Sequence, residues 1–337
     1  MLENELLSAT VLVEKGADVY ELRYKPKDVD VLCKTPWGLR DPGRALPSSS
    51  SETTWLETYG GGWQELFPSG GGPCTYKGVE LNFHGEVSLA RWEYEVVAAG
   101  GATAELRLSL RLARSPFRLE RTMIVEAGKP VLRLRERATN EGGEPISYMW
   151  GHHPAFGSPF LSEACRLDVG ARSLHADDSY DGPHNPLEPG RAYEWPLVES
   201  GGEALDLSRV PAPGEGRHLL AYFSDFESGW YALTNSELGF GVGLAWPLAD
   251  FPYAWFWQEM HASPGFPWYR SAYVLAVEPN TSFPAQGLTA AIEKTGTART
   301  LEPGESTECE LCAVFYEARG GVARIEPDGN VVPSRDA

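Results

Sequence analysis

Hydrophobic and polar residues alternate most regularly between residues 103 and 140, in three runs separated by short breaks. In the first run, TAELRLSLRLAR, every second residue from 106 to 112 is leucine. Ser115-Pro116 interrupts the pattern before FRLERTMIVEAG, and Gly128-Lys129-Pro130 interrupts it again before VLRLRERATN. A period of two predicts half-buried strands. Because parallel strands need long crossover connections, links this short predict an antiparallel meander.

The same strand-like pattern recurs along most of the chain. Residues 10–24 and 229–246 are each typical of two strands around a turn, and 86–97, 271–278 and 306–317 of further strands. No segment predicts a helix longer than two turns, and no repeat indicates a solenoid or a propeller. Many short strands at nearly regular spacing therefore predict an all-β fold, a large antiparallel β-sandwich.

Two segments predict long loops, the serine-rich LPSSSSETT of residues 46–54 and the turn-rich SYDGPHNPLEPG of residues 179–190. Neither shows the change in composition that marks a linker between domains. We therefore expect a single domain over residues 1–320, followed by a polar C-terminal tail over residues 321–337.

Composition narrows the choice of partners and of compartment. The 337-residue chain has a formal net charge of −18, which repels phosphate backbones and anionic lipid, so we expect neither nucleic acid nor a membrane as partner. The sequence has no apolar run of the ~20 residues that span a bilayer, and no signal-peptide pattern at its N-terminus. Its five cysteines are odd in number and scattered, which argues against a disulfide framework and predicts a cytoplasmic location. Cys309-x-x-Cys312 lies in a predicted strand, so these two cysteines are expected to pack in the core.

Four segments carry more polar or reactive residues than strands require. They are YGGGWQELFPSGGG (59–72), NFHGEVSLARW (82–92), WGHHPAFG (150–157) and LAVEPNTSFP (275–284). The glycines of the first segment allow its backbone to approach a ligand closely. In the last segment, Glu278 closes an apolar strand, where loss of water raises the pKa of a carboxyl group and makes it a candidate base. A purely structural role remains the alternative for each segment.

The aromatic segment FPYAWFWQEMHASPGFPWY (251–269) has two interpretations. Its alternating rings predict either the inner face of a core strand or a platform for the apolar face of a sugar ring. On the second interpretation, Trp257 stacks on the sugar, and Gln258 and Glu259 supply hydrogen bonds. An acidic chain with aromatic rings, amides and histidines suits a neutral polyhydroxyl ligand better than a charged one.

Metal and serine chemistry find less support in the sequence. His84, His152, His153 and Glu278 are possible metal ligands, but neighbouring residues of a strand point to opposite faces. No HxH or HxxxH spacing supports zinc, and no G-x-S-x-G motif supports a serine nucleophile. We therefore expect no metal.

Taken together and in order, these motifs resemble the aldose 1-epimerase (galactose mutarotase-like) family. The resemblance rests on GGWQELFPSGGG, NFHGEVSLARW, HHPAFG and AVEPNTSFP, with LEPGES before the last predicted strand, and it extends over nearly the whole chain. It implies a β-sandwich of the galactose mutarotase-like supersandwich type. It also implies an isomerase of carbohydrate metabolism, which interconverts the α and β anomers of a free aldose or a sugar derivative without a cofactor.

The resemblance also implies roles for single residues. Glu278 would be the base that takes the proton of the anomeric hydroxyl, His153 the acid that protonates the ring oxygen, and His84 a sugar-binding histidine. His152 replaces the small amide usual in the family and is expected to contact the sugar. The predicted substrate-binding residues are therefore His84, His152, Gln64, Glu65, Arg91, Trp257 and Gln258.

Two departures from the family pattern concern the sugar contacts. The glycine-rich loop lacks the family's arginine and has Trp63, Gln64 and Glu65 in that stretch, so Arg91 is the candidate replacement. The family's binding aspartate has no clear counterpart, and the candidates are Asp177, Asp178 and Asp225.

Two other functions remain open at this point. One is a non-catalytic carbohydrate-binding protein on the same sandwich, and the other is a metal-dependent β-sandwich enzyme that uses the histidines and Glu278. For the epimerase and for the carbohydrate-binding protein, the expected partner is a sugar. For the metal-dependent enzyme, it is a small molecule. In each case the chain is expected to be a monomer or a homodimer.

Overall fold

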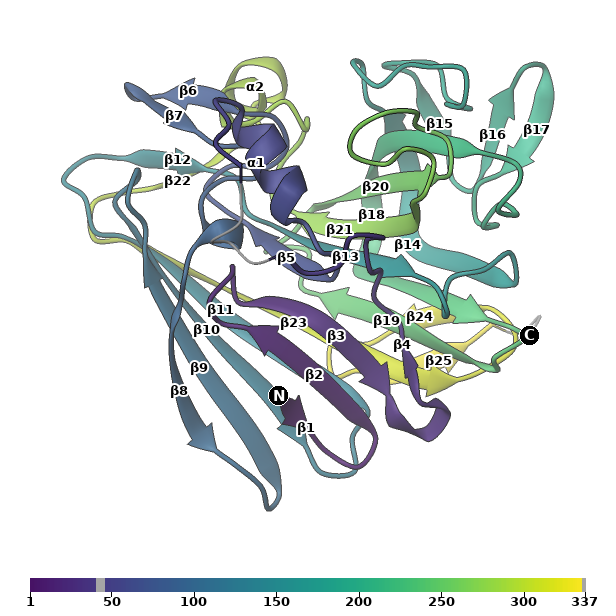
Figure 1. The fold of residues 1–337 in the computed structure, drawn as a ribbon, viewed down its shortest axis with the longest axis horizontal. Helices are drawn as coiled ribbons and strands as arrows, with labels where there is room; N and C mark the ends of the chain where they lie inside the picture. Colours follow the sequence, from purple (N-terminus) through teal and green to yellow (C-terminus); the bar gives the residue numbers. More distant parts are fainter. Residues whose placement is uncertain (41–45, 335–337) are drawn as a thin grey trace.

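One continuous antiparallel sheet, folded over on itself into two facing layers, makes up most of the computed structural model (Figure 1). The structure describes residues 1–40 and 46–334. The first layer runs in the order β8, β9, β10, β11, β23 and β19, with bounds Glu93–Ala98, Thr103–Arg111, Phe117–Glu126, Val131–Asn140, Ser306–Glu317 and Phe240–Trp246. The second layer runs β20, β21, β13, β5, β3, β2 and β1, with bounds Tyr253–Met260, Tyr273–Asn280, Gly151–Gly157, Trp63–Leu66, Asp18–Tyr24, Leu7–Leu12 and Leu2–Glu3.

Strand β18 (Arg217–Asn235) connects the two layers. Its first part pairs with β20, from Arg217 opposite Met260, and its last part pairs with β19, ending with Asn235 opposite Phe240. Between the two parts, Asp225 has a φ of 53°, a conformation that interrupts the regular extended backbone. Strand β14 (Cys165–Ala176) pairs with both parts of β18. One bent strand therefore lets a single sheet supply both layers.

The predicted meander is confirmed as β9, β10 and β11. Every second residue of β10 is buried, and four of these five, Phe117, Leu119, Met123 and Val125, are apolar. The fifth buried position is Arg121, a charged residue in an otherwise apolar row. The strands predicted within 10–24, 229–246, 271–278 and 306–317 are also present, whereas within 86–97 only the residues from Glu93 onward form a strand.

Two predictions about loops and ends are wrong. Ser51–Thr58 forms α1 inside the predicted loop, because the Ser50 side chain accepts the backbone N–H of Thr53 and caps the helix. In the predicted tail, β24 (Val322–Ile325) and β25 (Val331–Pro333) form a hairpin. Val322 and Ile325 are buried in a small apolar cluster with Trp230 and Ala245, so this segment packs on the sandwich.

Shorter elements connect the strands and cover one side of the second layer. They are η1 (Lys25–Lys27), β4 (Val29–Asp30), β6 (Cys74–Tyr76), β7 (Val79–Leu81), η3 (Val87–Leu89), β12 (Ile146–Tyr148), β15 (Ala192–Glu194), β16 (Leu197–Ser200), β17 (Glu203–Asp206), α2 (Leu288–Ala290), η4 (Ala291–Thr295) and β22 (Arg299–Leu301). In Figure 1, α1, the β6–β7 hairpin and α2 lie together above β5 and β13. Among the described residues, none of the helices is long and apolar enough to cross a bilayer.

Candidate functional site

His153 and Glu278 face each other from neighbouring strands of the second layer. Gly151 of β13 pairs with Asn280 of β21, and Ala155 pairs with Ala276, which places His153 opposite Glu278. The Nε2 atom of His153 lies 3.6 Å from Oε1 of Glu278, and both side chains are buried. Two residues that lie far apart in the sequence are therefore adjacent, because antiparallel pairing sets their register.

A cavity of about 460 Å³ opens over this pair. This volume is within the range of sites that enclose small ligands. The walls are mostly aromatic rings, contributed by Trp55, Tyr59, Phe83, Tyr180, Trp255, Trp257 and Trp268, and the polar side chains His84, His153, Glu278 and Gln286 also line it. The residues that line the cavity, all within the described part of the chain, include no lysine or arginine.

Helix α1 supplies one wall of the cavity and supports His84. The Trp55 ring stacks on Tyr59 with centroids 4.7 Å apart, and its indole N–H donates to Ser88 Oγ at 2.9 Å. The same indole contacts the His84 ring, with centroids 4.5 Å apart. The segment that the sequence suggested as a loop is thus a helix that positions a candidate sugar-binding histidine.

Hydrogen bonding to the backbone fixes the tautomer of His84. The N–H of Gly71 donates to His84 Nδ1 at 3.1 Å, so the proton of a neutral ring is on Nε2. Burial, with a smaller contribution from His153, lowers the pKa of His84 well below its ordinary value. His84 is therefore a neutral ring with one N–H that can donate. Gly71 has a φ of 69°, and a Cβ atom there would lie 1.9 Å from the Ala285 carbonyl oxygen.

Burial shifts the pKa values of the facing pair in opposite directions. Loss of water lowers the pKa of His153 to about 4 and raises the pKa of Glu278 well above its ordinary value. Because the pKa of Glu278 is raised and that of His153 is about 4, a single proton shared by the pair lies on Glu278 and leaves the His153 ring neutral. His153 Nδ1 and Glu278 Oε2 are buried and have no hydrogen-bond partner among the described residues. The pair combines an acid and a base with free polar atoms, as acid–base catalysis requires.

Gln286 presents a hydrogen-bond acceptor to the same cavity. Its amide nitrogen donates to Asp177 Oδ2 at 2.7 Å and to Ser179 Oγ at 2.9 Å. Asp177 also accepts the hydroxyl of Tyr222, whose oxygen accepts the backbone N–H of Ala285 at 2.8 Å. The amide oxygen of Gln286 is buried and has no partner among the described residues, so it can accept a ligand hydroxyl. Of the three candidate aspartates, Asp177 lies behind this wall and holds Gln286.

Trp257 is the one other predicted binding residue that lines the cavity. Its indole N–H donates to the hydroxyl of Tyr180 at 3.2 Å, and its ring lies 5.7 Å from that of His153. Our sequence interpretation did not identify Trp55, Tyr59, Tyr180 and Gln286 as site residues. Trp55 directly follows one segment interpreted as a loop (46–54), Tyr180 lies in the other (179–190), and no motif around Gln286 distinguishes it from a turn residue.

His152 and Glu65 point away from the cavity, so their prediction as sugar contacts is wrong. Successive residues of a strand point to opposite faces, and both lie on the face opposite His153. The Nε2 atom of His152 lies 2.9 Å from Glu136 Oε2, and the indole of Trp63 donates to Nδ1 at 3.3 Å. Glu65 forms an ion pair with Arg121.

Three further predicted contacts also lie outside the cavity and are likewise wrong. Gln64 lies opposite His153 on the same face of the sheet, but hydrogen bonds to Asp18 at 3.0 Å and to the Gly61 carbonyl at 2.8 Å engage its amide, and it does not line the cavity. Gln258 alternates with Trp257 along β20 and points into the core. The Arg91 side chain is 76% exposed and pairs with Glu14 at 3.1 Å, because η3 leads the chain away from His84 before residue 91.

A buried charged network occupies the face below the site. Arg121 pairs with Glu65 and Glu136, and Glu136 also lies beside His152 and the Cys309 thiol. Burial alone would raise the pKa of Glu136, but His152 and Arg121 together lower that pKa to about 2. The network links β5, β10, β11, β13 and β23 across the interior.

Within this network, Glu136, His152 and Cys309 have donor atoms within 4.8 Å of one another, the one such group found in the part of the chain that the structure describes. The geometry does not fit a metal. Trp63 can only donate to Nδ1 of His152, so the ring proton is on Nε2, toward Glu136. A metal at Nε2 would require a proton on Nδ1, facing that indole N–H, and the Arg121 guanidinium already pairs with both carboxylates, Glu65 and Glu136. The hypothesis that His84, His152, His153 and Glu278 bind one metal also fails, because His152 lies on the other face.

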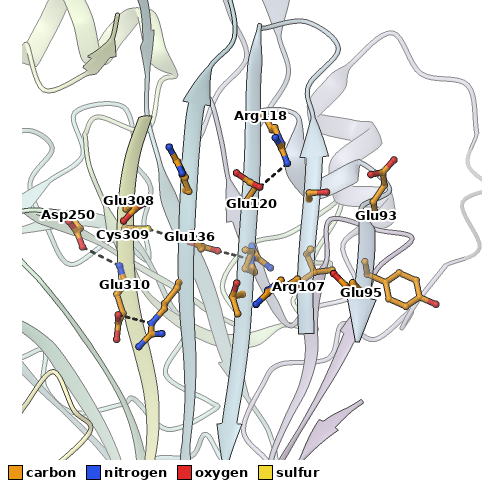
Figure 2. A pocket seen from close by; sticks show the side chains of 17 residues that line it. Glu93, Glu95, Arg107, Arg118, Glu120, Glu136, Asp250, Glu308, Cys309 and Glu310 are labelled. Atoms are coloured by element: carbon orange, nitrogen blue, oxygen red, sulfur yellow. Dashed lines mark hydrogen bonds and ion pairs between the residues drawn. The ribbon is translucent and has the colours of Figure 1, made fainter. Parts of the chain in front are cut away.

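A larger depression of about 960 Å³ lies across β8, β9, β10, β11 and β23 (Figure 2). Its side chains alternate in charge and pair with one another, as Arg118 does with Glu120 and Arg135 with Glu310. It offers no wall of aromatic rings and no set of buried atoms left without partners. The smaller cavity is therefore the candidate site.

Known proteins agree with this architecture. The family described as "Domain of unknown function (DUF4432)" matches residues 1–313. A "putative aldose 1-epimerase" from Klebsiella pneumoniae has a TM-score of 0.69 and 16% identity, over 93% of this chain and 77% of that one. A galactose mutarotase-like protein from Clostridium acetobutylicum has a TM-score of 0.63 and 14% identity, over 93% and 94%.

A galactose mutarotase-like protein from Lactobacillus casei has a TM-score of 0.60 and 18% identity, over 94% of this chain and 99% of that one. No curated protein matches the chain in sequence. These likenesses confirm the predicted fold, a large antiparallel β-sandwich of the galactose mutarotase-like type.

Proposed function

We propose that this chain, which belongs to the family described as "Domain of unknown function (DUF4432)", is an aldose 1-epimerase-like enzyme. It would interconvert the α and β anomers of a neutral aldose by acid–base ring opening. The observation that carries the proposal is the His153–Glu278 pair, 3.6 Å apart on neighbouring strands at the base of an aromatic cavity. The names of the structural neighbours also support it.

Ring opening needs one proton removed and one proton added. A base takes the proton of the anomeric hydroxyl, the bond between C1 and the ring oxygen breaks, and an acid protonates the ring oxygen as the aldehyde forms. Rotation about C1–C2 and the reverse steps close the other anomer. No net proton or electron is consumed, so a pair with one mobile proton is sufficient.

Substrate binding would determine which member of the pair carries that proton. In the free site, burial keeps it on Glu278. A sugar hydroxyl that donates to the Glu278 carboxylate stabilises its charged form, which favours transfer of the proton to His153. Glu278 then acts as the base and His153 as the acid, and the return of the proton reverses these roles for the opposite direction.

The other polar groups of the cavity would hold the sugar. His84 donates from Nε2, and Gln286 accepts through the amide oxygen that Asp177 leaves free. The Trp257 ring, beside His153, offers an apolar face on which a sugar ring can stack. Because no cation lines the cavity among the described residues, a neutral sugar fits better than a phosphorylated or acidic one.

Exchange NMR of α and β anomers across a panel of neutral aldoses tests the proposal. The wild type is expected to accelerate exchange of at least one sugar, and Glu278→Gln and His153→Asn to lose most of that acceleration. Arg91→Ala is the matched control, because its side chain lies in solvent, and it is expected to retain full activity. If every sugar exchanges at the buffer rate while sugars still bind, the protein is a carbohydrate-binding protein and the proposal is wrong.

A further inference from the structure

Three tryptophan rings form a continuous row that begins beside the acid–base pair. The Trp257 ring lies 5.7 Å from His153, Trp268 lies 5.6 Å from Trp257, and Trp37 lies 6.0 Å from Trp268. The first is in β20, the second follows that strand, and the third follows β4. Three separate segments thus build one aromatic surface, which extends away from Glu278.

Hydrogen bonds hold the two ends of this row. The indole N–H of Trp257 donates to the Tyr180 hydroxyl at 3.2 Å, and that of Trp37 donates to the Tyr59 carbonyl at 2.9 Å. Trp268 lies between them and packs against the edge of the Tyr59 ring, with centroids 6.2 Å apart. Its own indole N–H has no hydrogen-bond partner among the described residues. The middle ring, which belongs to a residue lining the cavity, therefore has an unpaired donor.

The cavity is larger than one sugar ring requires. His84, His153 and Glu278 line it together, and the His84 and His153 rings are 5.6 Å apart. Trp268, Pro267 and Leu56 line the same cavity, and a volume of about 460 Å³ is typical of sites for ligands larger than a single pyranose. A ring held over Trp257 at the acid–base pair leaves the face of Trp268 for a second group.

We infer that Trp268, supported by Trp37, forms a second sugar subsite, and that the substrate is the reducing end of a neutral disaccharide or longer oligosaccharide. This inference rests on the proposed function. The reducing sugar lies at His153 and Glu278, and the next ring stacks on Trp268. Aromatic faces bind the C–H faces of sugar rings, and the distance between Trp257 and Trp268 is that of neighbouring stacked groups.

Polar atoms of the cavity lining favour a sugar over an alkyl or aryl substituent as the group that binds on Trp268. The free indole N–H of Trp268, the hydroxyl of Tyr180 and the carboxylate of Glu52 all belong to residues that line the cavity. A hydrocarbon group would leave such polar atoms unpaired as it excluded water, which costs free energy. Sugar hydroxyls can pair with each of them.

The test compares reducing disaccharides with their component monosaccharides. For the wild type, kcat/KM in anomer exchange is expected to be about tenfold higher for at least one of maltose, cellobiose and lactose than for glucose and galactose. Trp268→Ala should remove that advantage, mainly through KM, by lowering kcat/KM for the disaccharide about tenfold more than for its component monosaccharides. One stacking contact of roughly 1.4 kcal/mol corresponds to this tenfold effect. Tyr269→Ala is the matched control, because Tyr269 is adjacent, exposed and outside the cavity lining.

Two results would overturn the subsite. One is equal kcat/KM for monosaccharides and disaccharides in the wild type, and the other is an equal loss for both in Trp268→Ala. Tryptophan fluorescence titration with the same disaccharides separates this inference from the proposed function. If no sugar exchanges faster than in buffer, the proposed function fails, and the subsite stands only if disaccharides bind the wild type more tightly than Trp268→Ala.

Discussion

The imidazole of His153 lies 3.6 Å from the carboxyl group of Glu278, and burial shifts the pKa values of these two groups in opposite directions. In water, a histidine and a glutamate that share one proton would hold it on the histidine, whose ordinary pKa is the higher of the two. Inside this cavity the same proton rests on the carboxyl group, because neither charge is solvated. This reversal has consequences that can be measured in the free protein.

The histidine rings of the site are expected to stay neutral under mildly acidic conditions. An ordinary exposed histidine takes up its proton with a midpoint near ~6.5, whereas the pKa of His153 is about 4 and that of His84 is also lowered. NMR titration of the histidine rings between pH 8 and 5.5 should show no change for these two, with His153→Asn to assign one of them. A midpoint near 6.5 for His153 would contradict the structure.

The same pKa shifts predict a broad plateau in the pH profile of kcat/KM for the proposed reaction. As the pH falls through about 4, His153 takes up a proton while Glu278 still carries its own. No base then remains in the pair, and the rate falls. As the pH rises through the raised pKa of Glu278, the mobile proton is lost and no acid remains. An acid limb with its midpoint near ~6.5 would show that His153 titrates as in water.

Glu278→Gln is expected to stabilise the fold, and to do so more strongly as the pH rises. A carboxyl group whose pKa is raised in the folded state costs no stability below its unfolded pKa of about 4.3, and costs more as the pH rises toward the folded value. Glutamine has nearly the same shape and no such cost. Urea unfolding should therefore show a larger gain in the free energy of unfolding at pH 8 than at pH 4.5. An equal effect at both pH values would contradict the raised pKa.

The strands and the residues of the candidate acid–base pair could be picked out from the sequence, because period-two alternation and short motifs are local signals. The meander over residues 103–140 follows from alternation alone. His153 and Glu278 follow from their motifs, and the structure places them together. Alternation also implied that His152 and His153 point to opposite faces, but not which face carries the cavity, and the motif resemblance favoured a sugar contact for both.

Apart from Trp257, the walls of the cavity depend on long-range contacts and were not predictable. Gln286 becomes a site residue only because Asp177, over a hundred positions earlier, holds its amide nitrogen. The buried charged network, in contrast, could have been predicted from Arg121. This residue interrupts the apolar row of β10, although our sequence interpretation did not use that signal. A charged residue at an inward position needs a buried partner, and Glu65 and Glu136 provide it.

Arg121→Met is expected to destabilise the protein by about 3–5 kcal/mol, because it leaves two buried carboxylates facing each other without a cation. Arg118→Met is the matched control on the same strand, since Arg118 pairs with Glu120 in a more exposed setting and should cost less than about 1 kcal/mol. Urea unfolding of the two variants at pH 7 makes the comparison. Equal losses would mean that the buried network contributes no more than a surface ion pair.

Gln286→Ala is expected to weaken substrate binding while leaving the acid–base step nearly intact. The variant removes an acceptor that Asp177 orients toward the cavity, but touches neither His153 nor Glu278. A lost hydrogen bond to a ligand hydroxyl costs roughly 1–1.5 kcal/mol, so KM should rise about tenfold and kcat change by less than about threefold. Lys294→Ala, an exposed change nearby, is the control. If kcat falls and KM is unchanged, Gln286 acts in the chemical step, and the cavity holds its sugar by the aromatic rings and His84 alone.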